Sequence, residues 1–264
     1  MNKNDRNRKG GLARIRIHGN PGTDAGRRLG GLRAIVSHTA SSGASCFKKL
    51  IKIPRLRYSS ALAEAFGILA GDGHVGTYQI SVTTNSQTDL EHAKYVRKLF
   101  RKLFKLRISF RLRKKQNACV IYVSSKKLCS TLGSMGLIQG DKIAAQLSIP
   151  IWIKQNRMYL HNFIRGLFDT DGCVYIDRHM IRGRSYAHLA ISFTSRSLPL
   201  LSDFKHSLEQ LGLHPTQKSK FAVFLRRREE INTYFAVVGS SNPKHLRKYR
   251  NFSKEAIRRG VRVV

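Results

Sequence analysis

The stretch that decides the fold occurs twice, as GILAGDG at residues 67–73 and as GLFDTDG at residues 166–172. Each copy ends a segment with helical periodicity, and each places an aspartate before its final glycine, at Asp72 and at Asp171. The two aspartates are 99 residues apart and hold the same place in a repeated pattern. A duplicated helix that ends in Asp-Gly therefore organises the chain.

Small residues recur every four positions in both helices. They are Ala63, Gly67 and Gly71 in the first helix and Asn162, Gly166 and Thr170 in the second. Residues four apart share one helical face, so we expect the two backbones to pack closely along these faces. Gly73 and Gly172 are expected to adopt the left-handed conformation that ends a helix and turns the chain into a strand.

The position of the two carboxylates is electrostatically unfavourable. A helix carries partial negative charge at its C-terminus, and two such ends side by side would add repulsion between the carboxylates. A sequence that does this twice is expected to hold a compensating cation. Hard divalent ions, Mg²⁺ above all, suit carboxylate and phosphate oxygens and support attack of water on a phosphodiester.

The pattern around each motif predicts an α+β fold of two pseudo-symmetric halves. Residues 58–154 and 155–264 each show the order α-β-β-α-β-β-α, which indicates a pseudo-two-fold molecule built on antiparallel sheets. In the first half we expect a hairpin or two strands over 74–84 and strands over 106–114 and 118–124. In the second half, residues 221–228 and 232–240 are the expected last two strands.

Residues 1–57 differ from the rest of the chain. They hold 14 Lys and Arg against two acids, together with many Gly and Ser, and KGGLARI at 9–15 recurs as LGGLRAI at 29–35. One interpretation of this basic N-terminal extension is a flexible tail. The other is a small accessory module that lays two Gly-Gly turns and several arginines along DNA phosphates.

Charge is the strongest global signal. The chain has 49 Lys and Arg against 15 Asp and Glu, a formal net charge of +34. Such a chain is attracted to polyanions, and nucleic acid phosphates are the usual ones. A ribosome-associated basic protein would share this charge but would leave the duplicated Asp-Gly helices unexplained.

The paired motifs resemble those of the LAGLIDADG homing endonucleases in their single-chain, two-motif form. The resemblance covers about residues 58–264. It implies that the motif helices form the interface between the halves and that Asp72 and Asp171 bind the catalytic metal, with Gly71 and Thr170 completing the metal site. The implied ion is Mg²⁺, with Mn²⁺ as a substitute. The earlier acidic position of the motif is Asp169 in the second copy but Ala70 in the first, a departure that matters little if this position is structural.

The resemblance also implies that the two sheets form a saddle along the DNA major groove. Arg suits guanine, and Asn or Gln suits adenine. The expected DNA-binding residues are Tyr78, Gln79, Ser81, Thr83, Arg107, Arg111, Arg113 and Tyr122 in the first half, and Arg178, Arg182, Arg184, His188, Arg226 and Arg228 in the second.

Basic and polar residues are expected around the scissile phosphates. Lys142 matches the lysine of the family between the motifs, and Lys248 resembles its counterpart in the second half. Their expected role is to stabilise charge in the transition state. Asn85 and Arg196 follow the second strand of each half, where the family often has a polar or basic residue of the active site.

The leading hypothesis is a metal-dependent endonuclease that cuts double-stranded DNA at a long, asymmetric site and is encoded within an intron. The alternatives are an RNA maturase that binds intron RNA and a non-cleaving DNA-binding regulator of the same fold. Both motif aspartates are retained, which favours the enzyme. With both halves in one chain we expect a monomer. Without an apolar run of 18 residues we expect no membrane contact, and a cytoplasmic, nucleoid-associated location or an organellar matrix.

Overall fold

The computed structural model describes residues 3–20, 22–42, 52–182, 184–258 and 262–263. The chain divides into two compact units, Met1–Leu50 and Ile51–Val264, which are described separately. Among the described residues, no helix is long and apolar enough to cross a membrane.

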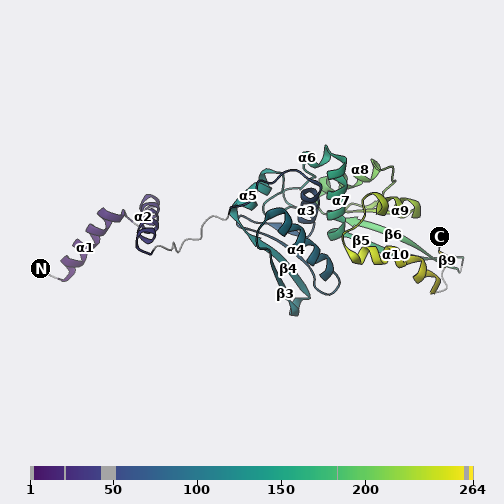
Figure 1. Ribbon diagram of the computed structural model, residues 1–264, viewed down its shortest axis with the longest axis horizontal. Coiled ribbons are helices and arrows are strands. Elements are labelled where there is room, and N and C mark those ends of the chain that lie inside the picture. Colours follow the sequence, from purple (N-terminus) through teal and green to yellow (C-terminus); the bar gives the residue numbers. More distant parts are fainter. Residues whose placement is uncertain (1–2, 21, 43–51, 183, 259–261, 264) are drawn as a thin grey trace. The chain divides into compact units, whose positions relative to one another are not determined.

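The N-terminal unit contains two helices, α1 (Lys3–His18) and α2 (Asp24–Ser42) (Figure 1). The interpretation with two Gly-Gly turns is wrong, because both glycine pairs, at 10–11 and 30–31, lie inside these helices. The good helix formers around each pair outweigh the cost of about 1 kcal/mol per glycine. The turn between the helices is instead built on Asn20, whose Oδ1 accepts the N–H of Gly22 at 2.9 Å.

The order of elements predicted for the first half is confirmed. Its elements are α3 (Ser60–Ala70), β1 (Gly73–Val75), β2 (Gln79–Asn85), α4 (Leu90–Phe104), β3 (Ser109–Arg113), the short 3-10 helix η1 (Lys114–Gln116), β4 (Ala118–Ser124) and α5 (Lys126–Ser134). Ser59 caps α3, its side chain accepting the N–H of Leu62, as expected for serine before an apolar periodic segment.

The second half repeats the order and adds elements at its end. After α6 (Ile151–Lys154) come α7 (Arg157–Asp171), β5 (Gly172–Ile181), β6 (Arg184–Thr194), α8 (Leu198–Glu209), β7 (Thr216–Ser219), β8 (Ala222–Leu225), α9 (Arg228–Val237), α10 (Pro243–Arg258) and β9 (Arg262–Val263). Asn156 caps α7 through the N–H of Tyr159.

The strand expected over residues 232–240 is wrong, because this segment belongs to α9 and the loop after it. The last two main strands of the half are β7 and β8. Ile231, Tyr234 and Val238 are buried at helical spacing, so packing on the core overrides the strand propensity of the local sequence. Glu229 and Glu230 in the first turn favour the helix dipole.

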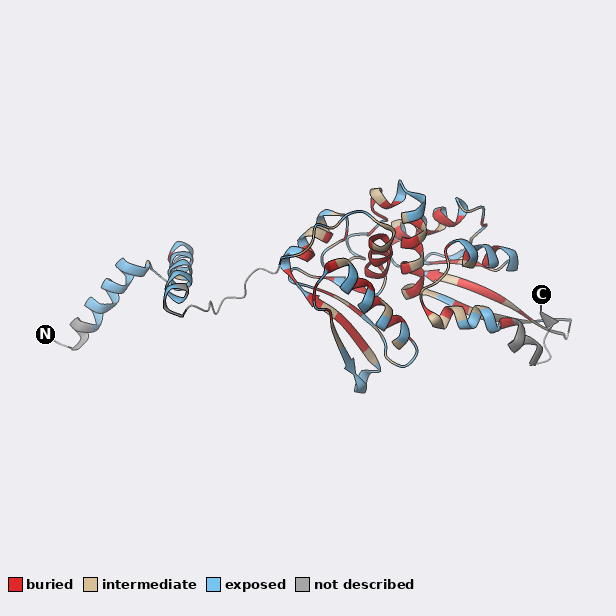
Figure 2. Ribbon diagram, viewed as in Figure 1, coloured by how far each residue is buried: buried red, intermediate tan, exposed pale blue. Residues whose placement is uncertain are grey.

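The two sheets have matching topology. Antiparallel strands run in the order β1-β2-β4-β3 in the first sheet and β5-β6-β8-β7 in the second, where β9 also pairs in parallel with β6. The motif glycines open corresponding strands, since Gly73 pairs with Val82 and Gly172 pairs with Phe193. Helices cover the face of each sheet that carries the core residues, such as Ile80 and Val82, and leave the other face open (Figure 2).

Helices α3 and α7 lie side by side at the centre of the unit formed by residues 51–264 (Figure 1). Their close packing, predicted from the small residues, is confirmed. A Cβ at Gly67 would overlap the backbone carbonyl of Phe163, and a Cβ at Gly166 would overlap that of Glu64. The two glycines therefore set how near the halves approach each other.

The motif glycines that follow the aspartates act differently from the prediction. Gly172 has φ −86°, and Gly73 is not among the residues with positive φ, so neither is left-handed. A Cβ at Gly73 would instead clash with Leu69, and one at Gly172 would clash with Phe168. Only glycine fits at these two positions, because each strand folds back closely against its own helix.

Candidate active site

The ends of the two motif helices meet, and this contact brings the two aspartates together. Gly71 lies against the second helix so closely that a Cβ there would be 2.9 Å from the Cβ of Thr170 and 3.3 Å from the carboxyl carbon of Asp171. Asp72 follows Gly71 directly. Each half therefore contributes one carboxylate to a shared site.

The surroundings of both carboxylates disfavour their charged forms. Burial first, and the negative charge of Asp72 second, raise the pKa of Asp171 to about 7, while Lys142 opposes the shift. The pKa of Asp72 is also raised, first by desolvation of its carboxyl group and also by Asp89, with Lys142 opposing. The residue as a whole still contacts solvent. The repulsion predicted from the sequence is thus present in the shift of Asp171, where Lys142 only partly offsets it.

Lys142 reaches the end of α3 from the segment that follows α5. Its Nζ donates to the carbonyl oxygens of Ala70 at 3.0 Å and Gly73 at 2.7 Å, and also to that of Gly71. Burial lowers its pKa, and the charges of Asp171 and Asp72 oppose this shift. The ammonium group therefore neutralises the negative end of the helix beside both carboxylates.

A groove of about 390 Å³ opens beside Asp72, and its lining includes Asn85, Thr170 and Lys244 but neither Asp171 nor Lys142. Lys244, in the first turn of α10, forms an ion pair with Asp89 at 2.6 Å. Its charge opposes the raised pKa of Asp72. Sequence reasoning missed Lys244, because only the folded chain brings the start of α10 to the start of α4.

The structure does not gather the other expected residues of the active site in the groove, apart from Asn85. Lys248 donates to the carbonyl of Val174 at 3.0 Å and does not line the groove. Asn85 lines the groove, and its Oδ1 accepts the N–H groups of Gln87 and Thr88. Arg196 is exposed in the loop between β6 and α8 and does not line the groove.

Asp169, the additional acid of the second motif, is part of the buried framework. Its Oδ2 accepts the N–H of Ser241 at 2.7 Å, and its Oδ1 accepts the hydroxyl of Ser240. Burial is the main cause that raises its pKa to about 7. Asn242, in the same loop, donates to the backbone of Asp169 and to Asp89. Asp169 thus anchors the loop that leads into α10 and Lys244.

The donor set at the helix ends fits a hard divalent ion. It consists of the carboxylates of Asp72 and Asp171 and the backbone oxygens of Gly71 and Thr170, their neighbours in sequence. The Gly71 oxygen accepts the ammonium of Lys142 in this structure. Oxygen ligands are the ones that Mg²⁺ prefers. The described residues contain no cluster of three His, Cys, Asp or Glu side chains that could hold a metal on its own.

Strand alternation decides which residues of the first sheet lie on its open face. Gln79, Ser81, Thr83, Arg111, Arg113 and Tyr122 lie opposite one another in the register of β2, β3 and β4, on the face that carries no helices. Two expected residues lie elsewhere. Arg107 lies beside the basic residues of α4, and Tyr78 precedes β2, with its ring under the ammonium of Lys126.

In the second sheet the open face carries His188 and Arg226 around Asp177. The distances from the Asp177 carboxylate are 3.3 Å to Nε2 of His188 and 3.9 Å to Nε of Arg226. Arg182 lies in the turn between β5 and β6 with φ 48°.

Two further arginines expected to bind DNA, Arg178 and Arg228, lie away from this open face. Arg178 pairs with Ala187 on the other side of the sheet, and Arg228 begins α9 rather than extending a strand. The side chain of Arg184 lies outside the described residues.

One family model matches the second half of the chain. The family model of the LAGLIDADG-like domain matches residues 158–251, which include the second motif. This half of the chain is therefore similar to a LAGLIDADG-like domain. No curated protein matches the sequence.

Solved structures extend the likeness to both halves. A mutant of I-SmaMI aligns with a TM-score of 0.50 and 12% identity, over 78% of this chain and 92% of that one. I-SmaMI bound to an uncleaved DNA target with calcium ions gives 0.50 and 12%, over 77% and 92%. The I-LtrWI LAGLIDADG homing endonuclease on its target DNA gives 0.49 and 12%, over 76% and 92%. The chain thus has the two-half LAGLIDADG fold.

Proposed function

We propose that this chain is a site-specific, metal-dependent endonuclease that cuts double-stranded DNA. The observation that carries the proposal is the meeting of Asp72 and Asp171 at the ends of two glycine-packed helices, one from each half. Two half-sites that share one pair of carboxylates suit a reaction on both strands of a duplex. With both halves in one chain, the enzyme acts as a monomer on an asymmetric target.

The DNA would lie along the open faces of the two sheets. Gln79, Arg111 and Arg113 offer donors to base edges and phosphates there. I-SmaMI, which shares the fold, has been solved with an uncleaved DNA target and calcium ions. This parallel supports a duplex on the same faces of the present chain.

The carboxylates of Asp72 and Asp171 would hold Mg²⁺, with Mn²⁺ as a substitute. The ion, when bound, supplies activation of water and neutralisation of the leaving oxygen. Lys142 and Lys244 both place positive charge near Asp72, where they can stabilise charge that develops on the phosphate. Asp89 holds the ammonium of Lys244 in place through its ion pair.

The substrate and location follow from the same proposal. An endonuclease of this kind encoded in an intron would cut the allele that lacks the intron, at the point of insertion. It would act wherever that DNA lies, in the nucleoid or in an organellar matrix.

The test compares Asp72→Asn and Asp171→Asn with the unaltered chain and with Asp141→Asn, whose carboxylate accepts backbone N–H groups in an exposed turn. The substrates are a plasmid that spans the intron-free insertion point and a randomised duplex library. In Mg²⁺ we expect cleavage by the unaltered chain and by Asp141→Asn. Both active-site variants should bind but not cut.

Replacing Mg²⁺ with Ca²⁺ should preserve binding and remove most cleavage, because Ca²⁺ accepts looser geometry. Cleavage at the normal rate by Asp72→Asn or Asp171→Asn would reject the proposed site. Binding of DNA without cleavage by the unaltered chain in Mg²⁺ would instead favour a regulator. Binding of intron RNA more tightly than the DNA target would favour a maturase.

A further inference from the structure

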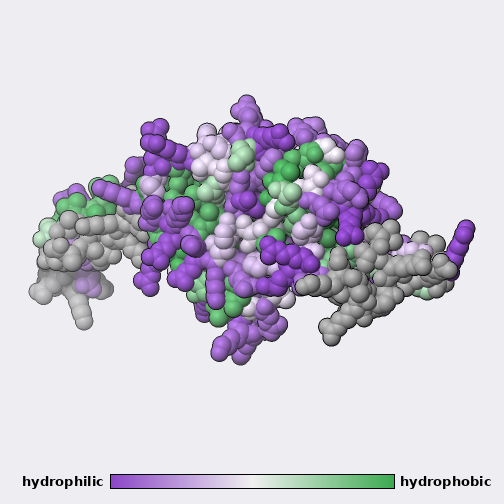
Figure 3. All heavy atoms as spheres, turned by 45° about the vertical axis from the view of Figure 1, so that its right-hand side comes forward, coloured by the Kyte–Doolittle hydropathy of each residue, from purple (hydrophilic) through white to green (hydrophobic). Residues whose placement is uncertain are grey.

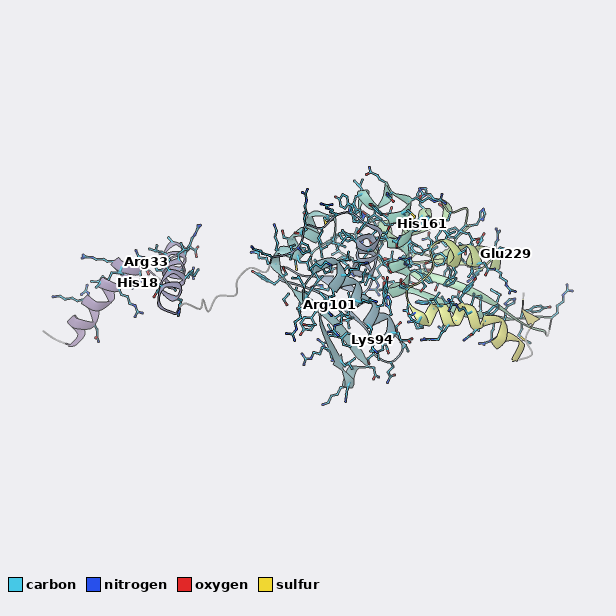
Figure 4. All side chains as sticks on the ribbon, in the orientation of Figure 1. His18, Arg33, Lys94, Arg101, His161 and Glu229 are labelled. Atoms are coloured by element: carbon cyan, nitrogen blue, oxygen red, sulfur yellow. The ribbon has the colours of Figure 1, made fainter. Side chains whose placement is uncertain are left out.

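The outer side of α4 carries a dense basic surface, here called the α4 basic face. It consists of seven residues: Lys94, Arg97, Lys98, Arg101, Lys102, Lys105 and Arg107. All but Lys94 line one surface hollow of about 850 Å³, whose remaining lining residues are Leu106 and Ile108. Figure 4 labels Lys94 and Arg101 on this helix. No acidic residue lines the hollow, so its charges are not paired within it.

The α4 basic face is separated from the open face of the first sheet. The inner side of α4 buries Ala93, Val96, Phe100 and Phe104 and packs on β2 and β4 from the side of the core. Both the sheet and the body of the helix therefore lie between the two surfaces. A straight duplex that follows the open face does not reach the outer side of α4.

The spacing of the charges suits a phosphate backbone. The residues recur every three or four positions, so they form one stripe, and from Lys94 to Lys105 it is about 16 Å long at the rise of an α-helix. Phosphates repeat several times over such a length of duplex. Arg97 is held in place, its Nε donating to the carbonyl of Ile108 at 3.3 Å.

The chemistry of this surface favours a duplex over a single strand. Single-strand sites stack bases on exposed aromatic rings, but the lining of the hollow contains no aromatic residue. The ring of Phe110, just beyond the lining, is partly buried and lies under the guanidinium of Arg97. The lining also contains no Ser, Thr, Asn or Gln, so its polar contacts come from Lys and Arg, the residues that bind phosphates.

We propose that the α4 basic face is a second, sequence-independent site for double-stranded DNA. This proposal rests on the proposed function in one respect: it assumes that a first duplex occupies the open sheet faces. The enzyme could then hold one DNA segment through phosphates while the sheets test another, which allows direct transfer between segments. Hydrophilic residues, drawn in purple, cover much of the face shown in Figure 3.

The test measures how many duplexes one full-length chain binds. The probe is a labelled random-sequence DNA of about 20 base pairs in excess at about 50 mM salt, a concentration at which phosphate contacts are strong. The bound number is read by sedimentation velocity. The variant is Lys98→Gln with Arg101→Gln and Lys102→Gln. The matched control replaces three exposed basic residues elsewhere, Lys127, Arg157 and Arg250, with Gln.

We expect two duplexes per chain for the unaltered protein and the control, and one for the α4 variant. Two duplexes on the α4 variant, or an equal loss in the control, would overturn the proposal. Tighter binding of an RNA duplex at this site would overturn the assignment to DNA.

Failure of the proposed function is measured separately. The α4 variant retains Asp72, Asp171 and the open sheet faces, so its rate of cleavage on a short target should be unchanged. A chain that never cuts DNA but binds two duplexes through α4 would refute the nuclease and leave this second site intact.

Discussion

Gly71 and Thr170 occupy the same position in the two motifs, and they contact each other across the centre of the molecule. A Cβ at Gly71 would lie 2.9 Å from the Cβ of Thr170. That contact leads directly into Asp72 on one side and Asp171 on the other. The geometry of the carboxylate pair therefore depends on helix packing and not only on the acids themselves.

Adding a methyl group at the centre of this packing should destabilise the chain. Gly67→Ala and Gly166→Ala would each place a Cβ onto the backbone of the opposite helix. Overpacking of this kind lowers the free energy of unfolding by about 1–3 kcal/mol, and we expect cleavage to fall further than stability does.

Urea unfolding of each variant at neutral pH measures the loss of stability. The control is Gly30→Ala, in α2, where a Cβ meets nothing within 4 Å; it should not destabilise the chain. Unchanged stability of Gly67→Ala would contradict the close approach of α3 and α7.

The raised pKa of Asp171 predicts how stability without metal depends on pH. The folded chain disfavours the charged form, because the pKa is about 7 instead of its ordinary value of 3.8. The folded state therefore binds more protons than the unfolded state between these values, and the contribution of Asp171 to stability is lost as pH rises through about 7.

Asp171→Asn should match the unaltered chain near pH 4 and melt at a higher temperature at pH 8, both in EDTA. Asp141→Asn should show the opposite sign. Its carboxyl has a lowered pKa because it accepts the N–H groups of Ala144 and Ile143, so losing it should not raise the melting temperature at pH 8. Equal melting of Asp171→Asn and the parent at pH 8 would mean that the folded chain does not disfavour the charged form of Asp171.

Lys244 and Lys248, which both lie in α10, should differ in their effect on cleavage. Lys244 lines the groove beside Asp72 and pairs with Asp89, whereas Lys248 bonds only a backbone carbonyl in the described contacts. Removing one preorganised stabilising group commonly costs about 100-fold or more in rate. We expect Lys244→Gln to show a loss of this order and Lys248→Gln a much smaller one.

Single-turnover cleavage at saturating protein separates this effect from DNA binding. Asp89→Asn should share part of the loss, because the ammonium of Lys244 would lose its ion pair. A larger loss of cleavage rate for Lys248→Gln than for Lys244→Gln would support the prediction from the sequence that Lys248 belongs to the active site.

Deleting residues 1–45 should weaken DNA affinity and reduce its dependence on salt, because helices α1 and α2 are rich in Lys and Arg. The position of the cut should not change, since the described residues of the site all belong to residues 51–264. Mapping the cleaved ends of the same target with both proteins provides the measurement. A displaced cut would show that these helices take part in recognition.

Much of the fold could be predicted because its information is local or repeated. The apolar stripes of α4 and α7, the cap before α3 and the alternation of β2 and β4 are properties of neighbouring residues. The duplicated motif added the pairing of two distant segments. Local pattern failed at residues 232–237, where strand-forming residues lie in α9 because Ile231 and Tyr234 are buried in the core.

The sequence by itself determined the two halves, the close helix packing through Gly67 and Gly166, and the candidate acids Asp72 and Asp171. Only the tertiary structure decided which lysine joins the groove, that Arg107 faces α4 instead of the open sheet, and that Gly73 and Gly172 are needed for space. Each of these depends on contacts between segments far apart in the chain or on the exact fold of the backbone. Helical and strand periods specify the face that a side chain occupies but not the neighbour that lies opposite it.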